Sequence, residues 1–233
     1  MLTALASFDP ALLDAWNTEL QRHGAEALLL AEPALAGPPD PIPWSRAASE
    51  VALTRWLLLP SAHAADAFVD EAGGPGGPTL RIAAIDEAAE LLRELGRQVD
   101  IRAASLGDLL ARLGPRLGRR QRVLAPHVAG GGKLISERLE ALGAEPICVA
   151  AYDYEESVAV EHPTRLVAIA TTVPQAESLA PAMRRAEADR AVLVTLGAAS
   201  ASAAEDSGAP QIREVGALPE TLEGLLDELR TVW

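Results

Sequence analysis

The 233-residue chain has one cysteine and one lysine, and aromatic residues make up only 3% of it. A single cysteine, Cys148, cannot form a disulfide within the chain, and such sparse use of cysteine is typical of a reducing compartment. Because Cys148 lies in an apolar run, we expect a buried structural thiol rather than a nucleophile. Acidic residues outnumber basic ones by 33 to 20, and the net charge of −13 argues against nucleic acid as a partner.

Long hydrophobic runs are absent as well. The longest apolar stretches, 27–31 and 55–60, are far too short to span a bilayer. The first ten residues lack the basic start and long apolar stretch of a secretory signal. We therefore expect a soluble cytoplasmic protein with no membrane partner. Its 49% hydrophobic and 23% charged residues are ordinary for a globular chain of one or two domains.

Several motifs with known chemistry are missing. No set of histidine, cysteine and carboxylate residues has the spacing of a metal site. Neither a Gly-x-Ser-x-Gly elbow nor a Gly-x-Gly-x-x-Gly fingerprint occurs. The glycine-rich stretch 73–77 is not followed by Lys-Ser/Thr, so it predicts a surface loop rather than a phosphate site. We expect neither a metal nor an organic cofactor.

Short apolar runs alternate with helical patterns along the whole chain. Three helices are indicated by leucine-rich stripes, the first beginning near Pro10 and the others preceded by Ser105 and Thr221 as N-caps. The second stripe extends from Leu106 to Leu117. This alternation predicts parallel sheets covered by helices. The expected buried strands are 2–6, 27–30, 56–59, 82–85, 122–125, 147–150, 166–170 and 191–196.

An internal duplication is indicated by segments that resemble one another in the same order. Three pairs of segments match: 105–113 with 221–229, 19–26 with 138–145, and, more weakly, 57–68 with 168–179. Each member of the second pair ends a predicted helix with glycine and then enters a strand. Ordered matches at similar offsets are difficult to obtain by chance.

Two stretches interrupt the alternation, a proline-rich one at 33–48 and a polar one at 151–163. They lie at equivalent places in the two copies, and we interpret them as extended connectors that cross side by side. The predicted fold class is α/β, with two interleaved doubly wound parallel-sheet domains joined by a two-stranded connector. One domain comprises 1–32 and 164–233 and the other 49–150, and we expect the working site between them.

The chemistry of such a site is expected in loops at the carboxyl ends of the strands. These loops carry small residues, hydroxyls and backbone N–H groups, which suit a ligand that bears oxyanions. The predicted loops are 60–63, 86–87, 127–133, 171–174 and 197–200.

The order of these elements resembles the uroporphyrinogen-III synthase family over nearly the whole chain. The matching segments are 56–68, 122–152, 171–172, 197–200 and 219–225, which are similar to that family's strand-and-turn motifs and its closing motif. The resemblance implies two α/β domains and a lyase of the hydro-lyase type in porphyrin and heme biosynthesis. It would cyclise hydroxymethylbilane, a linear tetrapyrrole polycarboxylate, to uroporphyrinogen III with inversion of the last ring.

The family's tyrosine, thought to assist the leaving hydroxyl, matches Tyr152, so the resemblance implies a catalytic role there rather than a side chain that merely packs at the hinge. The resemblance implies substrate contacts at Ser61, Ala62, His63, His127, Lys133, Thr171, Thr172, Gly197, Ala198 and Ser200. It implies no cofactor, and we expect a monomer.

The chain also departs from the family's pattern. Phe8-Asp9 stands where an arginine is common, Pro60 replaces a threonine, and Asp86-Glu87 replaces a Gly-x-x-Thr turn. Gly132 replaces an arginine, for which the adjacent Lys133 could substitute. His127 also stands where an arginine is frequent, and it could donate a hydrogen bond when protonated or be a solvated loop residue. Asp153 replaces a further arginine. Acidic residues at such places would repel a polycarboxylate. Two alternatives to the enzyme therefore stay open, a binding or regulatory protein of the same fold and a small-molecule binding protein of another family.

Overall fold

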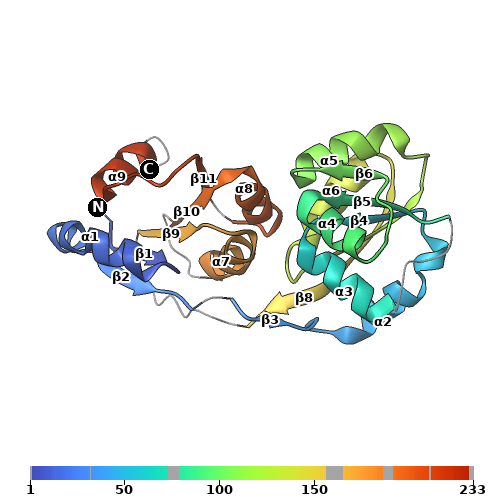
Figure 1. Cartoon of the computed structure of the whole chain (residues 1–233), viewed down its shortest axis with the longest axis horizontal. Helices are drawn as coiled ribbons and strands as arrows, with labels where there is room; N and C mark the ends of the chain where they lie inside the picture. Colours follow the sequence, from blue (N-terminus) through green and yellow to red (C-terminus); the bar gives the residue numbers. More distant parts are fainter. Residues whose placement is uncertain are drawn as a thin grey trace. The chain divides into compact units, whose positions relative to one another are not determined.

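The computed structural model describes residues 2–31, 33–72, 79–155, 165–185, 191–209 and 211–230. The chain divides into two compact units (Figure 1). The first unit comprises Met1–Ala34 and Glu155–Trp233, and the second comprises Leu35–Tyr154. Within the described residues, every helix is too short or too polar to cross a membrane.

The first unit is a parallel sheet with helices on both faces. Its strands are β1 (Ala4–Ser7), β2 (Glu26–Leu29), β9 (Leu166–Ala170), β10 (Ala191–Leu196) and β11 (Ile212–Val215), in the order β11-β10-β9-β1-β2. Strands from the two ends of the chain meet where β1 pairs with β9. Its helices are α1 (Pro10–His23), α7 (Val173–Arg185), α8 (Gly197–Asp206) and α9 (Leu222–Leu229).

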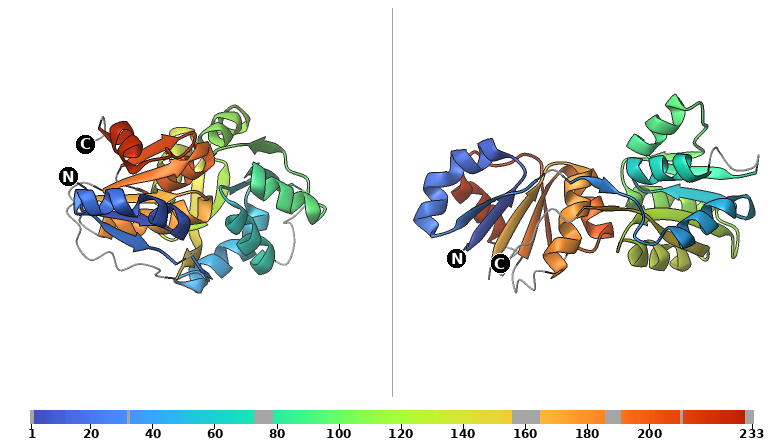
Figure 2. Two further views of the ribbon diagram at one scale, coloured as in Figure 1. Left: turned by 60° about the vertical axis from the view of Figure 1, so that its left-hand side comes forward. Right: turned by 90° about the horizontal axis from the view of Figure 1, so that it is seen from below.

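Successive side chains of these strands point to opposite faces of the sheet, and each face packs against its own layer of helices. Figure 2 shows the two layers on either side of the sheet. Val167 and Ile169 of β9 point to the face that α1 and α9 cover with leucines and Trp16. Leu166, Ala168 and Ala170 point to the opposite face, where α7 and α8 pack. Both faces of β9 are therefore buried, as in other parallel sheets, whereas β2, which was expected to be buried, lies at the edge of the sheet and its Leu29 is 61% exposed.

The second unit repeats this plan and adds one antiparallel strand. Its sheet has the order β3-β8-β7-β4-β5-β6, in which only β3 is antiparallel to its neighbour. The strands are β3 (Leu35–Ala36), β4 (Trp56–Leu59), β5 (Arg81–Ile85), β6 (Ile101–Ala103), β7 (Arg122–Val128) and β8 (Glu145–Tyr154). The helices are α2 (Pro41–Ser49), α3 (Ala62–Ala72), α4 (Asp86–Glu94), α5 (Leu106–Leu113) and α6 (Gly132–Ala141), with 3-10 turns η1 (Val51–Leu53) and η2 (Gly114–Arg116).

The two sheets have the same strand order, but the chain begins at a different strand position in each. Strands β9, β10, β11, β1 and β2 of the first unit occupy the places of β4, β5, β6, β7 and β8 in the second. The segments that resemble one another in sequence accordingly lie on equivalent helices, α9 with α5 and α1 with α6. The predicted α/β class with interleaved parallel sheets is confirmed, whereas the finer domain limits of 1–32, 49–150 and 164–233 stay a prediction.

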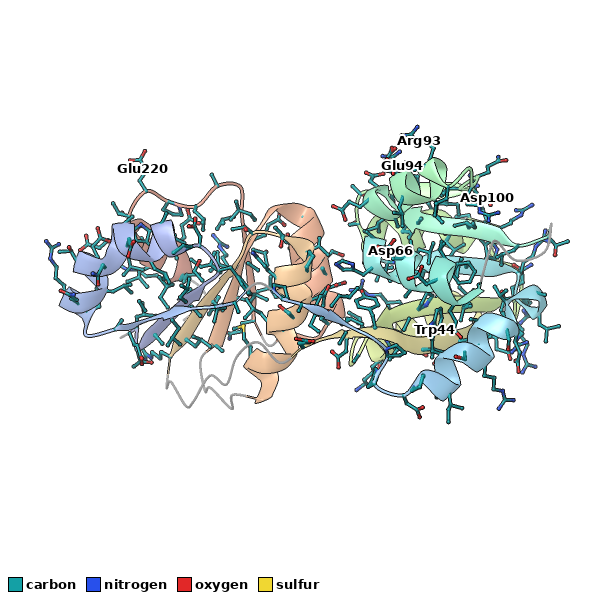
Figure 3. All side chains as sticks on the ribbon, turned by 60° about the horizontal axis from the view of Figure 1, so that its bottom comes forward. Trp44, Asp66, Arg93, Glu94, Asp100 and Glu220 are labelled. Atoms are coloured by element: carbon teal, nitrogen blue, oxygen red, sulfur yellow. The ribbon has the colours of Figure 1, made fainter. Side chains whose placement is uncertain are left out.

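The connector at 33–48 differs from the predicted extended stretch. Residues Pro41–Ser49 form α2, which Asp40 caps by accepting a hydrogen bond from the Ile42 N–H at 3.0 Å. Trp44, labelled in Figure 3, is buried in the core of the second unit. Only Leu35–Ala36 is a strand, paired with Asp153 and Tyr154 of β8. In the other predicted connector, 151–154 belongs to β8, and 156–163 lies outside the described residues.

The predicted N-caps are present. Ser105 accepts a hydrogen bond from the Asp108 N–H at 3.3 Å, and Thr221 accepts one from the Gly224 N–H at 3.1 Å. The second leucine stripe predicts a helix that continues to Leu117, but α5 ends at Leu113. Pro115 follows, and because proline has no backbone N–H to continue the α-helical hydrogen bonds, the chain turns there into η2.

Candidate functional site

Each sheet has one position at which strand order reverses, and ligands of doubly wound sheets bind beside that point, at the carboxyl ends of the strands. In the second unit it lies between β4 and β7, and in the first between β9 and β1. The residues that follow these four strands therefore define the candidate site in each unit.

A pair of buried hydroxyls lies at this edge of the second unit. Ser61 follows β4 and caps α3, because its Oγ accepts a hydrogen bond from the Ala64 N–H at 3.1 Å. Its Oγ also lies 2.7 Å from the phenol oxygen of Tyr152, which comes from β8. The side chains of Ser61 and Tyr152 are 1% and 2% exposed. The hydrogen bond joins residues 91 positions apart in the sequence.

The rings of His63 and Tyr154 lie beside the phenol of this pair. His63, from the first turn of α3, lies edge-on to Tyr152 and Tyr154 with ring centroids 5.8 and 6.0 Å away, and the two tyrosines are 6.0 Å apart. Burial lowers the pKa of His63, and the nearby Asp66 carboxylate partly opposes this shift. The buried Nδ1 of His63 has no hydrogen-bond partner among the described residues. A neutral imidazole with an unsatisfied nitrogen therefore lies next to the phenol.

His127 and Gly132 form a second feature of this edge. His127 lies inside β7, not in a loop, and is 7% exposed. Its Nδ1 is 2.7 Å from the Val128 carbonyl oxygen, to which it donates in the matching tautomer. A methyl group built on Gly132 would lie 2.2 Å from His127 Nε2, so the imidazole fills the space of the missing side chain. The burial of His127 inside β7 corrects the alternative of a solvated loop residue and lowers the pKa of the imidazole, whereas a substrate contact at His127 stays a prediction.

The other residues that were predicted to contact the substrate do not form a cluster of this kind. Ala62 is the first residue of α3, half-buried beside Ser61. Lys133 is in the first turn of α6, with a side chain 87% exposed and Nζ 3.9 Å from a Glu137 oxygen. Gly197, Ala198 and Ser200 form the first turn of α8 rather than a loop. Ala198 is exposed, whereas Ser200 is buried, so the two differ in their access to a ligand.

A cleft of about 320 Å³ lies at the reversal point of the first unit. Thr171 lines it and donates from its backbone N–H and its Oγ1 to Gln175 Oε1, at 2.9 and 3.0 Å. Thr172 accepts a hydrogen bond from the Gln175 N–H at 3.4 Å, which caps α7. The lining residues are Ser7, Phe8, Asp9, Pro10, Ile169, Thr171 and Gln175, and none of them is cationic.

Sequence reasoning missed Ser7, Ile169 and Gln175 of this cleft. Gln175 is three residues beyond Thr172, the spacing at which a helix cap meets its partner, and that spacing was the available signal. Ser7 and Ile169 have no comparable signal, because they reach the cleft only through the pairing of β1 with β9.

Charge is distributed unevenly between the units. The first unit has 7 basic and 18 acidic residues, whereas the second has 13 and 15. The acidic turn of the second unit is also compensated, because Arg102 forms ion pairs with Asp86 and Glu90. Hydrogen bonds from Arg93 and Arg102 lower the pKa of Glu90. Asp86 and Glu87 are the first residues of α4, where the helix dipole favours acids.

Other chemistries find little support in the described part of the chain. It contains no group of three or more potential metal-binding side chains. Burial raises the pKa of the Cys148 thiol to about 11, so a reactive thiolate is rare near neutral pH.

The fold and these polar clusters define a class of protein, a duplicated doubly wound α/β chain with hydroxyl-rich carboxyl edges. A family model described as uroporphyrinogen-III synthase HemD matches residues 14–227. The chain belongs to the uroporphyrinogen-III synthase family.

Solved structures of uroporphyrinogen III synthases have a fold similar to that of this chain. A mutant uroporphyrinogen III synthase from the bacterium Thermus thermophilus is 17% identical, with a TM-score of 0.55 and coverage of 98% of this chain and 99% of that one. A second Thermus thermophilus uroporphyrinogen III synthase structure is 14% identical, with a TM-score of 0.52 and coverage of 98% and 100%. No curated protein sequence matches the chain significantly.

Proposed function

We propose that this chain catalyses the cyclisation of hydroxymethylbilane to uroporphyrinogen III, with inversion of the last pyrrole ring. Membership of the family supports the reaction class. The observation that carries the proposal is the contact between the phenol of Tyr152 and Ser61, 2.7 Å apart at the reversal point of the second sheet. A tyrosine thought to assist the leaving hydroxyl is what the family resemblance implied at this position.

The reaction needs a proton donor and a template. Hydroxide leaves the hydroxymethyl group of the first ring as water once it has received a proton, and a cationic azafulvene remains. The last ring then attacks this carbon through its substituted position, and the spiro intermediate fragments and closes with that ring inverted. A phenol, with an ordinary pKa near ~10, is a reasonable donor to a departing hydroxide. Holding the two ends of the bilane together supplies much of the remaining acceleration, up to ~7–11 kcal/mol in favourable cases.

Carboxylate binding is the harder requirement, because the substrate is a polyanion. The nearly balanced charge of the second unit favours that unit as the carboxylate-binding one. There the helix N-termini at Ser61–His63 and Gly132–Lys133 offer backbone N–H groups, and Lys133 adds an exposed cation. We assign Thr171, Thr172, Gly197 and Ala198 of the first unit to neutral parts of the substrate.

The test is an isomer assay with purified protein and freshly generated hydroxymethylbilane. The type III isomer is expected above the spontaneous type I background, and type I alone would refute the enzyme. Tyr152→Phe should reduce the rate of type III formation by about 10-fold or more. The loss of a general acid usually costs ~10²–10⁴-fold. Tyr154→Phe is the matched control, because it removes a hydroxyl two residues away on the same strand.

A second candidate is a binding or regulatory protein of the same fold that has lost efficient catalysis. The acidic first unit, with Asp9 at its cleft, favours this alternative. Such a protein would bind the bilane, as measured by protection from spontaneous closure, without producing type III isomer. We further propose that the protein acts as a cytoplasmic monomer, for which light scattering should give a mass near 24.4 kDa.

A further inference from the structure

Several arginines of the second unit form no ion pair with a described residue. By contrast, Arg102 is held by Asp86 and Glu90 near the carboxyl end of β6. The arginines without an ion pair lie in the last turn of a helix, in a loop that leads into a strand, or at the first residue of a strand. They therefore gather at the amino edge of the parallel strands, opposite the candidate site. They are Arg55, Arg81, Arg97, Arg112, Arg116, Arg119 and Arg120, which we call the arginine edge.

Strand pairing brings these arginines close together. The Arg55 N–H donates to the Arg122 carbonyl oxygen at 3.1 Å, and the Arg81 N–H donates to the Arg55 carbonyl oxygen at 3.0 Å. Three neighbouring strands, β5, β4 and β7, thus start at or directly after an arginine, at the ~4.8 Å spacing of paired strands. Arg119 and Arg120 precede β7 and are exposed. Because like charges at such spacing repel one another, the arginine edge favours an anionic counterpart.

Neutral groups orient some of these side chains without cancelling their charge. Arg55 Nη1 donates to the Thr79 carbonyl oxygen at 3.0 Å. The Arg81 guanidinium lies over the Trp56 ring, 5.5 Å from its centroid. A guanidinium group that is already ordered and keeps its full charge loses less entropy when it binds a carboxylate.

The turn before β7 has the same property. Arg116 Nη1 donates to the Asp100 carbonyl oxygen at 3.2 Å, whereas the Asp100 carboxylate accepts from the Ile82 N–H at 2.9 Å. The side chains of Arg119 and Arg120 have no partner in the described chain. Arg120 also adopts a φ of 56°, a left-handed conformation that glycine adopts without strain. Its side chain is therefore presented at the expense of backbone strain.

The width of the arginine edge decides which kind of anion it fits. It extends over the starts of four strands, roughly 15 Å at ~4.8 Å per strand, so a small anion can contact only one or two of its side chains. A nucleic acid would be repelled by a chain with a net charge of −13, and Trp56 is 1% exposed, so its ring cannot stack on a base. Separate carboxylates on a protein surface match the separate guanidinium groups.

We propose that the arginine edge is a docking surface for an acidic face of another protein. Docking there leaves the carboxyl edge of the sheet open, so a partner and a ligand at the candidate site can bind together. The inference rests on the second unit alone and does not depend on the proposed reaction.

A short fluorescein-labelled poly-L-glutamate is a suitable probe of this surface, and fluorescence anisotropy at low salt measures its binding. The unmodified protein should bind the probe, and added salt should weaken the binding. Arg119→Gln/Arg120→Asn removes two arginines without a partner, and asparagine tolerates the left-handed backbone. Because an exposed ion pair contributes modestly, this double variant should bind the probe roughly 3- to 30-fold more weakly.

Arg22→Gln/Arg230→Gln is the matched control. It removes the same charge from exposed positions of the first unit, so the affinity for the probe should change by less than about two-fold. Arg119→Gln/Arg120→Asn should also keep the rate and the KM of type III formation, because it leaves the carboxyl edge unchanged.

The docking role would be overturned if the unmodified protein did not bind poly-L-glutamate, or if both double variants lost affinity equally. Tighter binding of single-stranded DNA than of poly-L-glutamate would overturn it in favour of a nucleic acid. A raised KM for the bilane in Arg119→Gln/Arg120→Asn would make the arginine edge a substrate site instead. Dimerisation that this variant abolishes would assign the edge to a second copy of the chain. Absence of type III product from the unmodified protein would refute only the proposed function, because the anisotropy measurement does not need catalysis.

Discussion

Replacement of Gly132 by alanine should destabilise the second unit, although glycine to alanine in a helix usually does the opposite. Gly132 is the first residue of α6, and the position of its absent side chain is occupied by the His127 ring. The new methyl group would lie 2.2 Å from His127 Nε2 and 2.6 Å from Cε1, well inside van der Waals contact. The imidazole must therefore move.

The magnitude follows from what holds that ring. His127 is buried, and its Nδ1 hydrogen bond to the Val128 carbonyl would be broken or bent when the ring turns. Overpacking of a core typically costs about 1–3 kcal/mol, and one lost hydrogen bond costs about 0.5–1.5 kcal/mol. Gly132→Ala should therefore lower the free energy of unfolding by about 1.5–4.5 kcal/mol.

Urea unfolding followed by far-ultraviolet circular dichroism measures this loss. Gly107→Ala is the matched control, because Gly107 lies in the first turn of α5 and its added methyl would have Ser105 Oγ as nearest neighbour at 3.9 Å. This variant should be neutral or up to about 1 kcal/mol more stable.

A double variant decides whether the imidazole is the cause. His127→Ala removes the ring, so Gly132→Ala should cost much less in that background, with a coupling of about 1 kcal/mol or more. A fully additive pair, or a Gly132→Ala protein as stable as the unmodified one, would refute the packing argument.

Three further predictions concern protonation and charge. Burial lowers the pKa of His127 below the ordinary 6.5, so the unfolded chain binds more protons between the two values. The free energy of unfolding should then fall as the pH falls through and below 6.5, by at most ~1.4 kcal/mol per pH unit. In His127→Gln, the free energy measured by urea unfolding should change less between about pH 7.5 and 5. Cys148 is half-buried, and since burial raises the pKa of its thiol to about 11, native protein should react with iodoacetamide more slowly than urea-unfolded protein; equal rates would contradict the raised pKa. Asp9→Asn keeps the cap of α1 but removes a charge at the first-unit cleft, so KM for the bilane should fall roughly five-fold at low salt, corresponding to about 1 kcal/mol; an unchanged KM would place Asp9 away from the substrate.

The longer apolar runs were sufficient to predict the core strands. Runs such as Trp56–Leu59 and Leu166–Ala170 are buried on both faces, and this burial leaves a continuous apolar signal in the sequence. The short strands β3, β6 and β11 were not predicted, because none of them contains more than two consecutive apolar residues. Helix α2 was hidden by Pro41 and Pro43, which are tolerated because they fall within its first turn.

The candidate site could be predicted only in part. The N-cap chemistry of Ser61 and Thr172 is local, so sequence reasoning could find both residues beside helix starts. The Ser61–Tyr152 bond and the cleft beside Thr171 depend on strand order, which no local pattern encodes. The burial of His127 likewise depends on the space left by Gly132, so two departures from the family pattern that are separate in the sequence form one packing arrangement.

We propose that Tyr152 enables this chain to form uroporphyrinogen III. The most direct measurement is the ratio of type III to type I product from freshly generated hydroxymethylbilane, compared between the unmodified protein and the Tyr152→Phe variant. We expect mainly type III product from the unmodified protein and a clearly slower rate from the variant. Type I product alone from the unmodified protein, or equal type III rates from both proteins, would contradict it.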